Sequence, residues 1–335
     1  MLYHHLFAFP DRIHYTYISL INFNGKTLPY FIGDFGKLCV AIFLFLGGYG
    51  TYYVYKNNTK GLIEKKLFNL YKAFLKVFII TIPISVLLHD KQVVITVENF
   101  INNITGINTT FNGEWWFLMP YVCLIILSPL LIFIINKIGK NVYISFILLI
   151  IYQLLLTNYY PKILSLSIFD KFRMSNLYLN MTYTLYLLST FVCGMLFSKF
   201  KLLDIIKQKY TNKKIYTIIS IVLLILIFIL RRKVWKYDCD YVYAPIFIIS
   251  MTIILSNNIF TKLKEVLISI GNNSTNIWLI HSFFCYHWCQ RFIFMPKLSV
   301  LIFLLLLVVS YISSIIINKF YKFIGGLYGT QNASS

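Results

Sequence analysis

The sequence predicts an all-α, polytopic bundle of transmembrane helices. Of its 335 residues, 59% are hydrophobic and only 13% are charged, whereas an average soluble domain has roughly 45–50% apolar and about 25% charged residues. The hydrophobic residues fall into runs, and many of the basic residues stand between these runs. A water-soluble globular core is therefore excluded, and the lipid bilayer is the expected solvent.

Nine apolar runs approach the length of a transmembrane helix, which needs about 20 residues to cross a hydrocarbon layer of roughly 30 Å. They cover residues 31–54, 70–88, 115–135, 142–157, 182–197, 215–230, 241–255, 276–289 and 298–317. The run at 276–289 is short and needs its flank to about residue 294. Residues 1–9 form an apolar stub that, at 1.5 Å per residue, reaches only about 14 Å. We therefore expect about ten helices, the first of them truncated.

The chain reads as one membrane domain over residues 1–325, followed by a short polar tail at 326–335. If the loops alternate between two sides of the membrane, the side that holds both termini carries the larger share of the 31 basic residues. The positive-inside rule then places both termini in the cytoplasm of a multi-pass protein of the plasma (cell) membrane. The basic run at 231–236 opposes this rule, so we expect Arg231 and Arg232 to face an anionic acceptor or a lipid headgroup.

The formal net charge of +20 would suggest nucleic-acid binding in a soluble chain. Here the basic residues border apolar runs, which is typical of loops held against anionic lipid headgroups. We expect membrane lipids as partners and no nucleic acid. The sequence has no GxxxxGK[ST] loop, GxSxG elbow or HExxH pair, so neither ATP-driven transport nor the familiar hydrolase chemistries have support.

Ionisable residues at membrane depth are costly, so each is a candidate for function. His4 and His5 lie in the apolar stub, ahead of a turn that carries Asp11 and Arg12. Histidine can take a proton from a hydroxyl near neutral pH. The residues alone leave open whether these histidines act as a general base or only cap a helix end.

Two further groups lie at the edges of apolar runs. Glu114 opens a helix together with Trp115 and Trp116, where an interfacial aromatic belt is the alternative for the two indoles. A second set, His281 with Cys285 and Cys289, follows an i, i+4, i+8 spacing. This stack would spread its side chains over about 12 Å, too far for one ion, so we expect no bound metal.

Four stretches stand in the order of the motifs of a known family. They are HHLF at 4–7, FLFLGGY at 43–49, WFLMPY at 116–121 and GNNSTNIWLIH at 271–281. They resemble the first-helix histidine, the F-x-x-S-G-Y segment, the W-F-L element and the G-x-x-S-x-x-I-Y-L-x-H ending of integral membrane acyltransferases of the acyltransferase-3 type. CGMLF at 193–197 is similar to the family's F-x-x-G segment. Gly47 stands where the family has Ser, and KLFNLY at 66–71 replaces its R-x-x-R segment.

The resemblance implies transfer of an acyl group, in the first place acetyl, to a hydroxyl of a cell-surface or exported glycan. Acetyl-coenzyme A or another acyl-coenzyme A would be a co-substrate, with Lys65 and Lys66 neutralising its phosphates and no cofactor bound. His5, or His4 next to it, would act as base or carry the acyl group. The acceptor would meet a set of polar and aromatic side chains, namely Tyr49, Glu114, Trp115, Trp116, Arg231, Arg232 and His281.

Two other functions stay open at the level of the sequence. The chain could be a transporter or flippase of a lipid-linked sugar, since any helix bundle with buried polar groups could serve. No inverted repeat and no pair of Gly/Pro-broken helices is visible in the sequence, which favours the enzyme. The short first helix leaves an inactive scaffold descended from the enzyme as a third hypothesis. The sequence does not indicate an oligomeric state.

Overall fold

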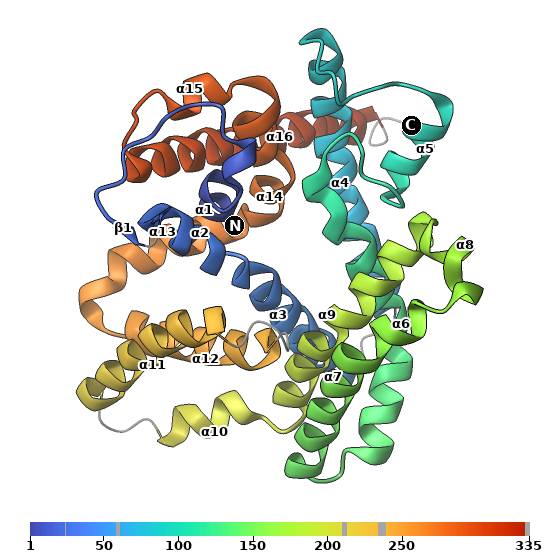
Figure 1. Ribbon diagram of the computed structural model, residues 1–335, viewed down its shortest axis with the longest axis vertical. Helices are drawn as coiled ribbons and strands as arrows, with labels where there is room; N and C mark the ends of the chain where they lie inside the picture. Colours follow the sequence, from blue (N-terminus) through green and yellow to red (C-terminus); the bar gives the residue numbers. More distant parts are fainter. Residues whose placement is uncertain (24, 58–60, 210–212, 234–238, 332–335) are drawn as a thin grey trace. The chain divides into compact units, whose positions relative to one another are not determined.

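The computed structural model describes residues 1–23, 25–57, 61–209, 213–233 and 239–331, which fold almost entirely into helices (Figure 1). Within these ranges the strands form one short antiparallel pair, β1 (Asn22–Phe23) with β2 (Lys26–Thr27). Helices satisfy every backbone polar group within one segment, which is what a bilayer demands of a spanning chain. The predicted all-α, polytopic membrane bundle is confirmed.

Among the residues that the structure describes, seven helical segments are long and apolar enough to cross a membrane. They are Leu28–Lys56, Ile63–Leu87, Gly113–Ile138, Val142–Leu164, Asn176–Lys199, Lys214–Lys233 and Ser299–Phe323. An eighth span results if Asp240–Leu255 and Asn258–Asn272, which meet at a 94° bend, count as one. Seven of the nine predicted runs therefore coincide with these spans, and the run at 241–255 with the bent pair.

The described ranges contain fewer long helices than the ten or so that the sequence predicts. Residues 1–9 contain only the six-residue helix α1 (Leu2–Phe7), and the run at 276–289 is divided between α14 (Ser274–Ser282) and the π-helix η6 (Phe283–Trp288). At its far end α16 (Ser299–Gln331) continues beyond residue 326, and the polar tail expected at 326–335 stays a prediction. Apolar composition alone did not reveal these interruptions and extensions.

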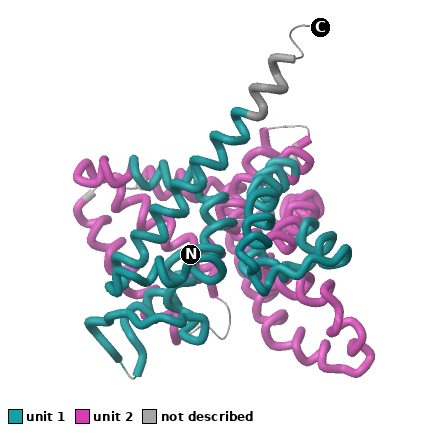
Figure 2. The backbone as a smooth tube through the Cα atoms, turned by 90° about the horizontal axis from the view of Figure 1, so that it is seen from above, with its two compact units in different colours: residues 1–36, 68–115, 265–335 teal, residues 37–67, 116–264 magenta. Residues whose placement is uncertain are grey.

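The described chain separates into two compact units, each assembled from several stretches of sequence (Figure 2). Unit 1 consists of residues 1–36, 68–115 and 265–335, and unit 2 of residues 37–67 and 116–264. Each unit combines stretches that are separate in the sequence, so the order of residues along the chain does not by itself reveal either unit. The single membrane domain expected over 1–325 stays a prediction.

Unit 1 contains the N-terminal and C-terminal elements. In chain order these are α1, η1 (Pro10–Arg12), β1, β2, α2 (Leu28–Phe35), most of α4 (Leu62–Leu87), α5 (Val97–Thr105), the start of η2 (Gly113–Phe117), most of α13 (Thr261–Asn272), α14, η6, α15 (Gln290–Phe294) and α16. Helix α1 packs against α2, α14 and α16. Its apolar side chains Leu2, Leu6 and Phe7 join a buried cluster with residues of α14, α15 and α16. Burial of these three side chains fixes the rotation of α1.

Two glycines bring α2 close to α1. A Cβ on Gly33 would come within 3.0 Å of the backbone nitrogen of Ala8, and one on Gly36 within 3.1 Å of the Cβ of His4. Small residues at such positions let helix backbones approach closely in membranes, where packing rather than water drives association. The close approach holds the histidine-bearing helix against α2.

Unit 2 is built around the contact between α3 (Leu38–Lys56) and α9 (Asn176–Lys199). Its other elements are the first turn of α4, the end of η2, α6 (Leu118–Ile138), α7 (Val142–Leu164), η3 (Ser167–Phe169), α8 (Asp170–Arg173), α10 (Leu202–Lys209), α11 (Lys213–Lys233), α12 (Asp240–Leu255), η5 (Asn258–Phe260) and the first residues of α13. Helices α6, α7 and α12 pack against α9, and α11 packs against α12.

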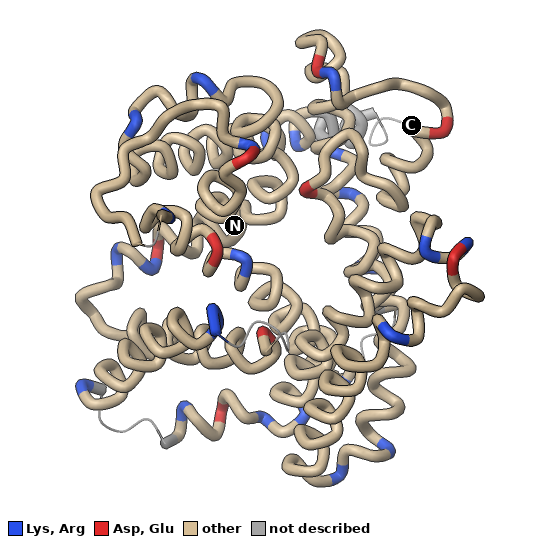
Figure 3. The backbone as a smooth tube through the Cα atoms, viewed as in Figure 1, with Lys and Arg blue, Asp and Glu red and all other residues tan. Residues whose placement is uncertain are grey.

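The surfaces of the long helices fit a lipid environment. Each candidate span has a window with at most two charged residues, and many Lys, Arg, Asp and Glu positions lie near helix ends or in connecting loops (Figure 3). On α11, Ile218, Val222 and Ile225 are more than half exposed. Such apolar exposure would be a liability in water and is the expected condition in a bilayer.

The α3–α9 contact gives a test of the fold. A Cβ on Gly194 of α9 would overlap the carbonyl oxygen of Phe45 on α3, so we expect Gly194→Ala to force the helices apart and to destabilise the protein by about 1–3 kcal/mol. Gly50→Ala on α3 is the matched control, because its Cβ would meet nothing within 4 Å. Thermal unfolding in detergent micelles measures both; equal midpoints for the two variants would contradict this packing.

Candidate active site

The candidate site is a cluster of buried imidazole and carboxylate groups with one half-exposed guanidinium, all within unit 1. The Nδ1 atom of His5 lies 3.2 Å from Oε2 of Glu114 and 3.2 Å from Nε2 of His281. The side chains of His5 and Glu114 are each 9% exposed, and His281 is fully buried. Three segments far apart in sequence, α1, η2 and α14, therefore bring three ionisable side chains together, with Glu114 and His281 both at Nδ1 of His5.

Helix α1 separates the roles of its two histidines. Consecutive residues of a helix point about 100° apart, so both rings cannot face the same side. The Nδ1–H of His4 donates to the carbonyl oxygen of Gly33 on α2, with a distance of 2.8 Å between the nitrogen and the oxygen. His5 instead faces α14 and the carboxylate. His4 thus joins α1 to α2, while His5 belongs to the buried cluster.

Glu114 is held through both its side chain and its backbone. Its Oε1 accepts a hydrogen bond of 2.6 Å from Nη1 of Arg12, which provides the opposite charge that a buried carboxylate needs. Its backbone N–H donates to Oδ1 of Asn112 at 3.1 Å, and its carbonyl oxygen accepts from the indole Nε1 of Trp278 at 3.2 Å. The carboxylate is therefore fixed in position.

Arg12 is positioned in turn by the segment that follows α14. The side-chain amide of Gln290 donates to the carbonyl oxygens of Arg12 and Cys285, at 2.8 and 2.9 Å, and accepts from the backbone N–H of His14 at 3.1 Å. Burial lowers the pKa of the Arg12 guanidinium, but the charge and hydrogen bond of Glu114 outweigh burial and raise it. Arg12 therefore stays protonated at every physiological pH.

The π-helix η6 contributes Tyr286, whose hydroxyl donates to the carbonyl oxygen of His5. The guanidinium carbon of Arg12 lies 5.5 Å from the ring centroid of Tyr286 and 4.6 Å from that of Phe9. Cation–π contacts of this kind add to the fixed position of the guanidinium. π-Helical turns occur frequently at functional sites, and here the turn aims one phenol at the histidine-bearing helix.

Four residues of this cluster were not among the site candidates from the sequence: Arg12, which was named only as part of a turn, and Asn112, Tyr286 and Gln290. Arg12 and Asn112 stand beside candidates that the sequence did identify, so proximity in sequence was a usable signal for both. Gln290 is a buried polar side chain in the flank of an apolar run, and such residues mark functional positions in membranes. Nothing local distinguishes Tyr286 from the chain's other 25 tyrosines.

Trp115 takes a structural position in unit 1. It is completely buried, its Nε1–H donates to the carbonyl oxygen of Leu279 at 2.9 Å, and its ring packs against Phe74 and Phe283. A side chain with no accessible surface offers no contact to a substrate in this conformation. Trp115 therefore packs η2 against α14, and its predicted contact with the acceptor stays a prediction. Trp116, in unit 2, is half-buried and lies 4.9 Å from the ring of Tyr183.

The remaining candidates also lie in unit 2, and the predictions for them stay predictions. Tyr49 is a half-buried residue of α3. Arg231 forms a bidentate pair with Asp240, at 2.7 and 2.9 Å, and is largely buried. Its guanidinium is thereby paired with a carboxylate, and the neighbouring Arg232 is exposed. Residues 234–236 of the same basic run lie outside the described ranges.

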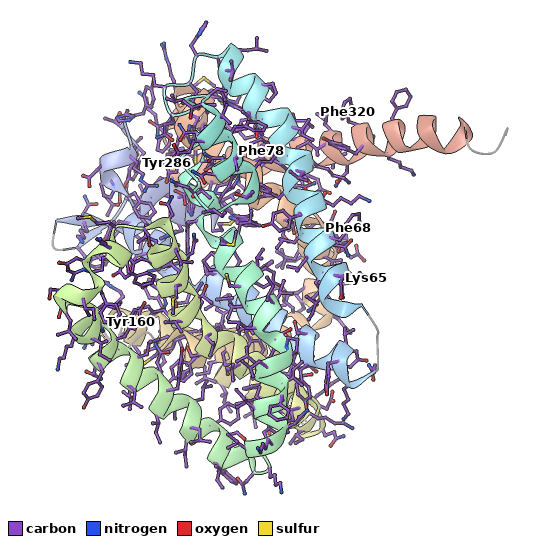
Figure 4. The ribbon with its side chains drawn as sticks, turned by 90° about the vertical axis from the view of Figure 1, so that its right-hand side faces the viewer. Lys65, Phe68, Phe78, Tyr160, Tyr286 and Phe320 are labelled. Carbon is purple, nitrogen blue, oxygen red and sulfur yellow. The ribbon has the colours of Figure 1, made fainter. Side chains whose placement is uncertain are left out.

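The two lysines predicted to meet the acyl donor differ in their surroundings. Lys65 is exposed near the N-terminal end of α4 (Figure 4). The ammonium of Lys66 is half-buried and donates to the hydroxyl of Thr51 at 2.5 Å. Because it is exposed, Lys65 can approach a phosphate from solvent. Lys66 would contact a phosphate with an ammonium that is already partly removed from water. In the described ranges no three His, Cys, Asp or Glu side chains come together as metal ligands.

Comparison with known proteins gives the family. A family model described as an acyltransferase domain, of the acyltransferase-3 type, matches residues 1–319. The chain therefore belongs to this family of membrane acyltransferases, and the resemblance drawn from its motifs is confirmed. Searches of the curated proteins and of the solved structures found no match.

The structural position of Trp115 can be tested separately from function. We expect Trp115→Phe to lose the bond to Leu279 and to destabilise the protein by about 1–3 kcal/mol, without changing KM for either substrate per folded molecule. Trp116→Phe is the matched control and should cost less stability, because its ring is only half-buried. Thermal unfolding and kinetics on the same preparations measure both; a raised KM with unchanged stability for Trp115→Phe would contradict a purely structural role.

Proposed function

We propose that this membrane acyltransferase transfers an acetyl group from acetyl-coenzyme A to a hydroxyl of a cell-surface or exported glycan at the plasma membrane. Family membership supplies the general reaction of acyl transfer. The observation that carries the proposal is the contact of His5 with Glu114, 3.2 Å apart in a buried site next to Arg12. Such an imidazole–carboxylate pair is the arrangement from which a histidine acts as a general base.

The chemistry requires one proton acceptor and one proton donor. In the proposed reaction the acceptor hydroxyl gives its proton to His5 while its oxygen attacks the carbonyl carbon of the thioester. The new C–O ester bond forms as the C–S bond breaks, and the departing thiolate takes the proton from the imidazolium. The products are the O-acetyl ester and free coenzyme A. The negative charge of Glu114 would stabilise the imidazolium that exists between these two events.

Two features support the proposed substrates. Lys65 and Lys66 present two positive charges at the start of α4, which suits the phosphates of coenzyme A. Trp116 and Tyr183 lie ring against ring, 4.9 Å apart, and are both partly accessible. Aromatic faces of this kind suit the apolar faces of a sugar ring, so we propose that Trp116 meets the acceptor. Tyr49 and Arg232 are further proposed contacts.

The two histidines make the first functional test. We expect His5→Ala to reduce acetyl transfer by about 10²–10⁴, the usual contribution of a general base, while His4→Ala loses a packing hydrogen bond and has a milder effect. The measurement is transfer of radiolabelled acetyl from acetyl-coenzyme A to cell-surface glycan, in membranes that carry each variant at matched levels of folded protein.

The outcomes of this test separate two errors. If His4→Ala were inactive and His5→Ala near normal, the assignment of the two rings would be reversed. If both variants kept near-normal transfer, the histidine mechanism itself would fail.

The donor lysines make a second test. We expect Lys65→Ala to raise KM for acetyl-coenzyme A by about threefold to tenfold, the effect of removing one exposed charge from a phosphate contact worth about 1 kcal/mol. The increase should shrink as salt is added, because exposed charges are screened. Lys162→Ala on α7 is the control, since Lys162 is also an exposed lysine and is expected on the opposite side of the membrane. An equal KM in the two variants would contradict the donor assignment.

A further inference from the structure

We propose that His281 is a positioning residue, which holds His5 in the tautomer that leaves Nε2 of His5 free to take a proton from the acceptor. The catalytic consequence rests on the proposed function, whereas the tautomer itself does not. Sequence analysis placed His281 among the groups that touch the acceptor. The structure gives it no accessible surface for such a contact.

The hydrogen bonds of His281 show which of its two ring nitrogens carries the proton. Its Nδ1 lies 2.8 Å from the carbonyl oxygen of Trp278 and 3.1 Å from that of Ile277. A carbonyl oxygen can only accept, so the nitrogen facing both must carry the proton. In the neutral ring the other nitrogen, Nε2, then bears a lone pair and acts as an acceptor. This is the atom that lies 3.2 Å from His5.

The neighbours of His5 in turn determine which of its ring nitrogens carries the proton. Its Nδ1 faces two acceptors, Nε2 of His281 and Oε2 of Glu114, each at 3.2 Å. A proton on Nδ1 can be shared by both. A proton on Nε2 instead would turn the Nδ1 lone pair toward a carboxylate and a second lone pair, in a buried site where unpaired acceptors cost about 1–3 kcal/mol each. The surroundings therefore select the Nδ1–H form and leave Nε2 as the basic nitrogen.

His281 is the more rigid of the two acceptors. Its ring is fully buried and is anchored by two carbonyls of its own helix, whereas Glu114 shares its carboxylate with Arg12, whose side chain is half exposed. The rings of His5 and His281 meet at a centroid distance of 4.8 Å. The hydrogen bond that His5 donates to His281 thus sets the orientation of the His5 ring as well as its tautomer, while Glu114 supplies charge.

Two substitutions test the role by its effect on rate. His281→Leu removes the acceptor, and we expect kcat to fall about 10- to 100-fold, less than for loss of the base itself because Glu114 remains. KM for both substrates should stay within about twofold, since His281 touches neither. His281→Gln places a side-chain carbonyl at the depth of the imidazole Nε2, and we expect it to restore kcat to within about fivefold of the wild type. If Gln and Leu lost kcat equally, the role would be packing alone.

The matched control is His287→Leu, because His287 is another buried imidazole, paired with Asp90 at 2.8 Å outside the candidate site. It should lose stability and keep its kcat per folded molecule. A loss of kcat equal to that of His281→Leu would show that any buried imidazole in this segment is needed, and would overturn the assignment.

A spectroscopic measurement decides the tautomer without reference to catalysis. In solid-state NMR of the full chain labelled with ¹⁵N-histidine in lipid, we expect His5, assigned by its absence in His5→Ala, to show a protonated Nδ1 and an unprotonated Nε2. The reverse pattern would overturn the proposal even if acyl transfer were normal. If the wild type transferred no acetyl but showed the expected pattern, the proposed function would fail while the positioning of His5 by His281 stood.

Discussion

The buried carboxylate of Glu114 is the constraint on which the rest of the site depends. A carboxylate removed from water is strongly unfavourable unless it is paired and hydrogen-bonded. Here the pairing charge comes from Arg12 and the second contact from His5, so the N-terminal segment must fold back onto η2. Gln290 then holds the backbone of Arg12, and Trp278 holds that of Glu114. One costly charge thus accounts for why segments from both ends of the chain meet in unit 1.

The motifs that the chain shares with its family divide between packing and chemistry. Gly48 and Gly194 lie where α3 and α9 touch, and a Cβ on either would overlap backbone of the opposite helix. These two glycines are therefore required by helix packing, as small residues often are in membranes. His5 and His281 come from the first and last motifs and meet in the site. The family motifs thus supply packing glycines in unit 2 and polar site residues in unit 1.

The π-helix η6 shows how irregular backbone serves a buried polar site. A regular helix would continue the apolar run at 276–289 as a span, but the wider turn at Phe283–Trp288 sends neighbouring side chains to different partners. Tyr286 reaches the carbonyl oxygen of His5, and His287 reaches Asp90. Gln290 meets the carbonyl oxygen of Cys285 just after the turn. Non-helical backbone at such depth is tolerated where protein satisfies its polar groups.

The sequence by itself determined the solvent, the helical class and most of the spans, because hydropathy and span length are properties of local composition. It also named His4 and His5 as candidate site residues. Only the tertiary structure decided which side chains meet. Glu114 and His281 lie far from His5 in the chain, and their contact depends on how α1, η2 and α14 pack. The same holds for Trp115, which packing turned inward, and for Arg231, which Asp240 neutralised. Local sequence patterns do not indicate such partners, since a contact between distant residues depends on how the whole unit packs and not on the residues next to them in the sequence.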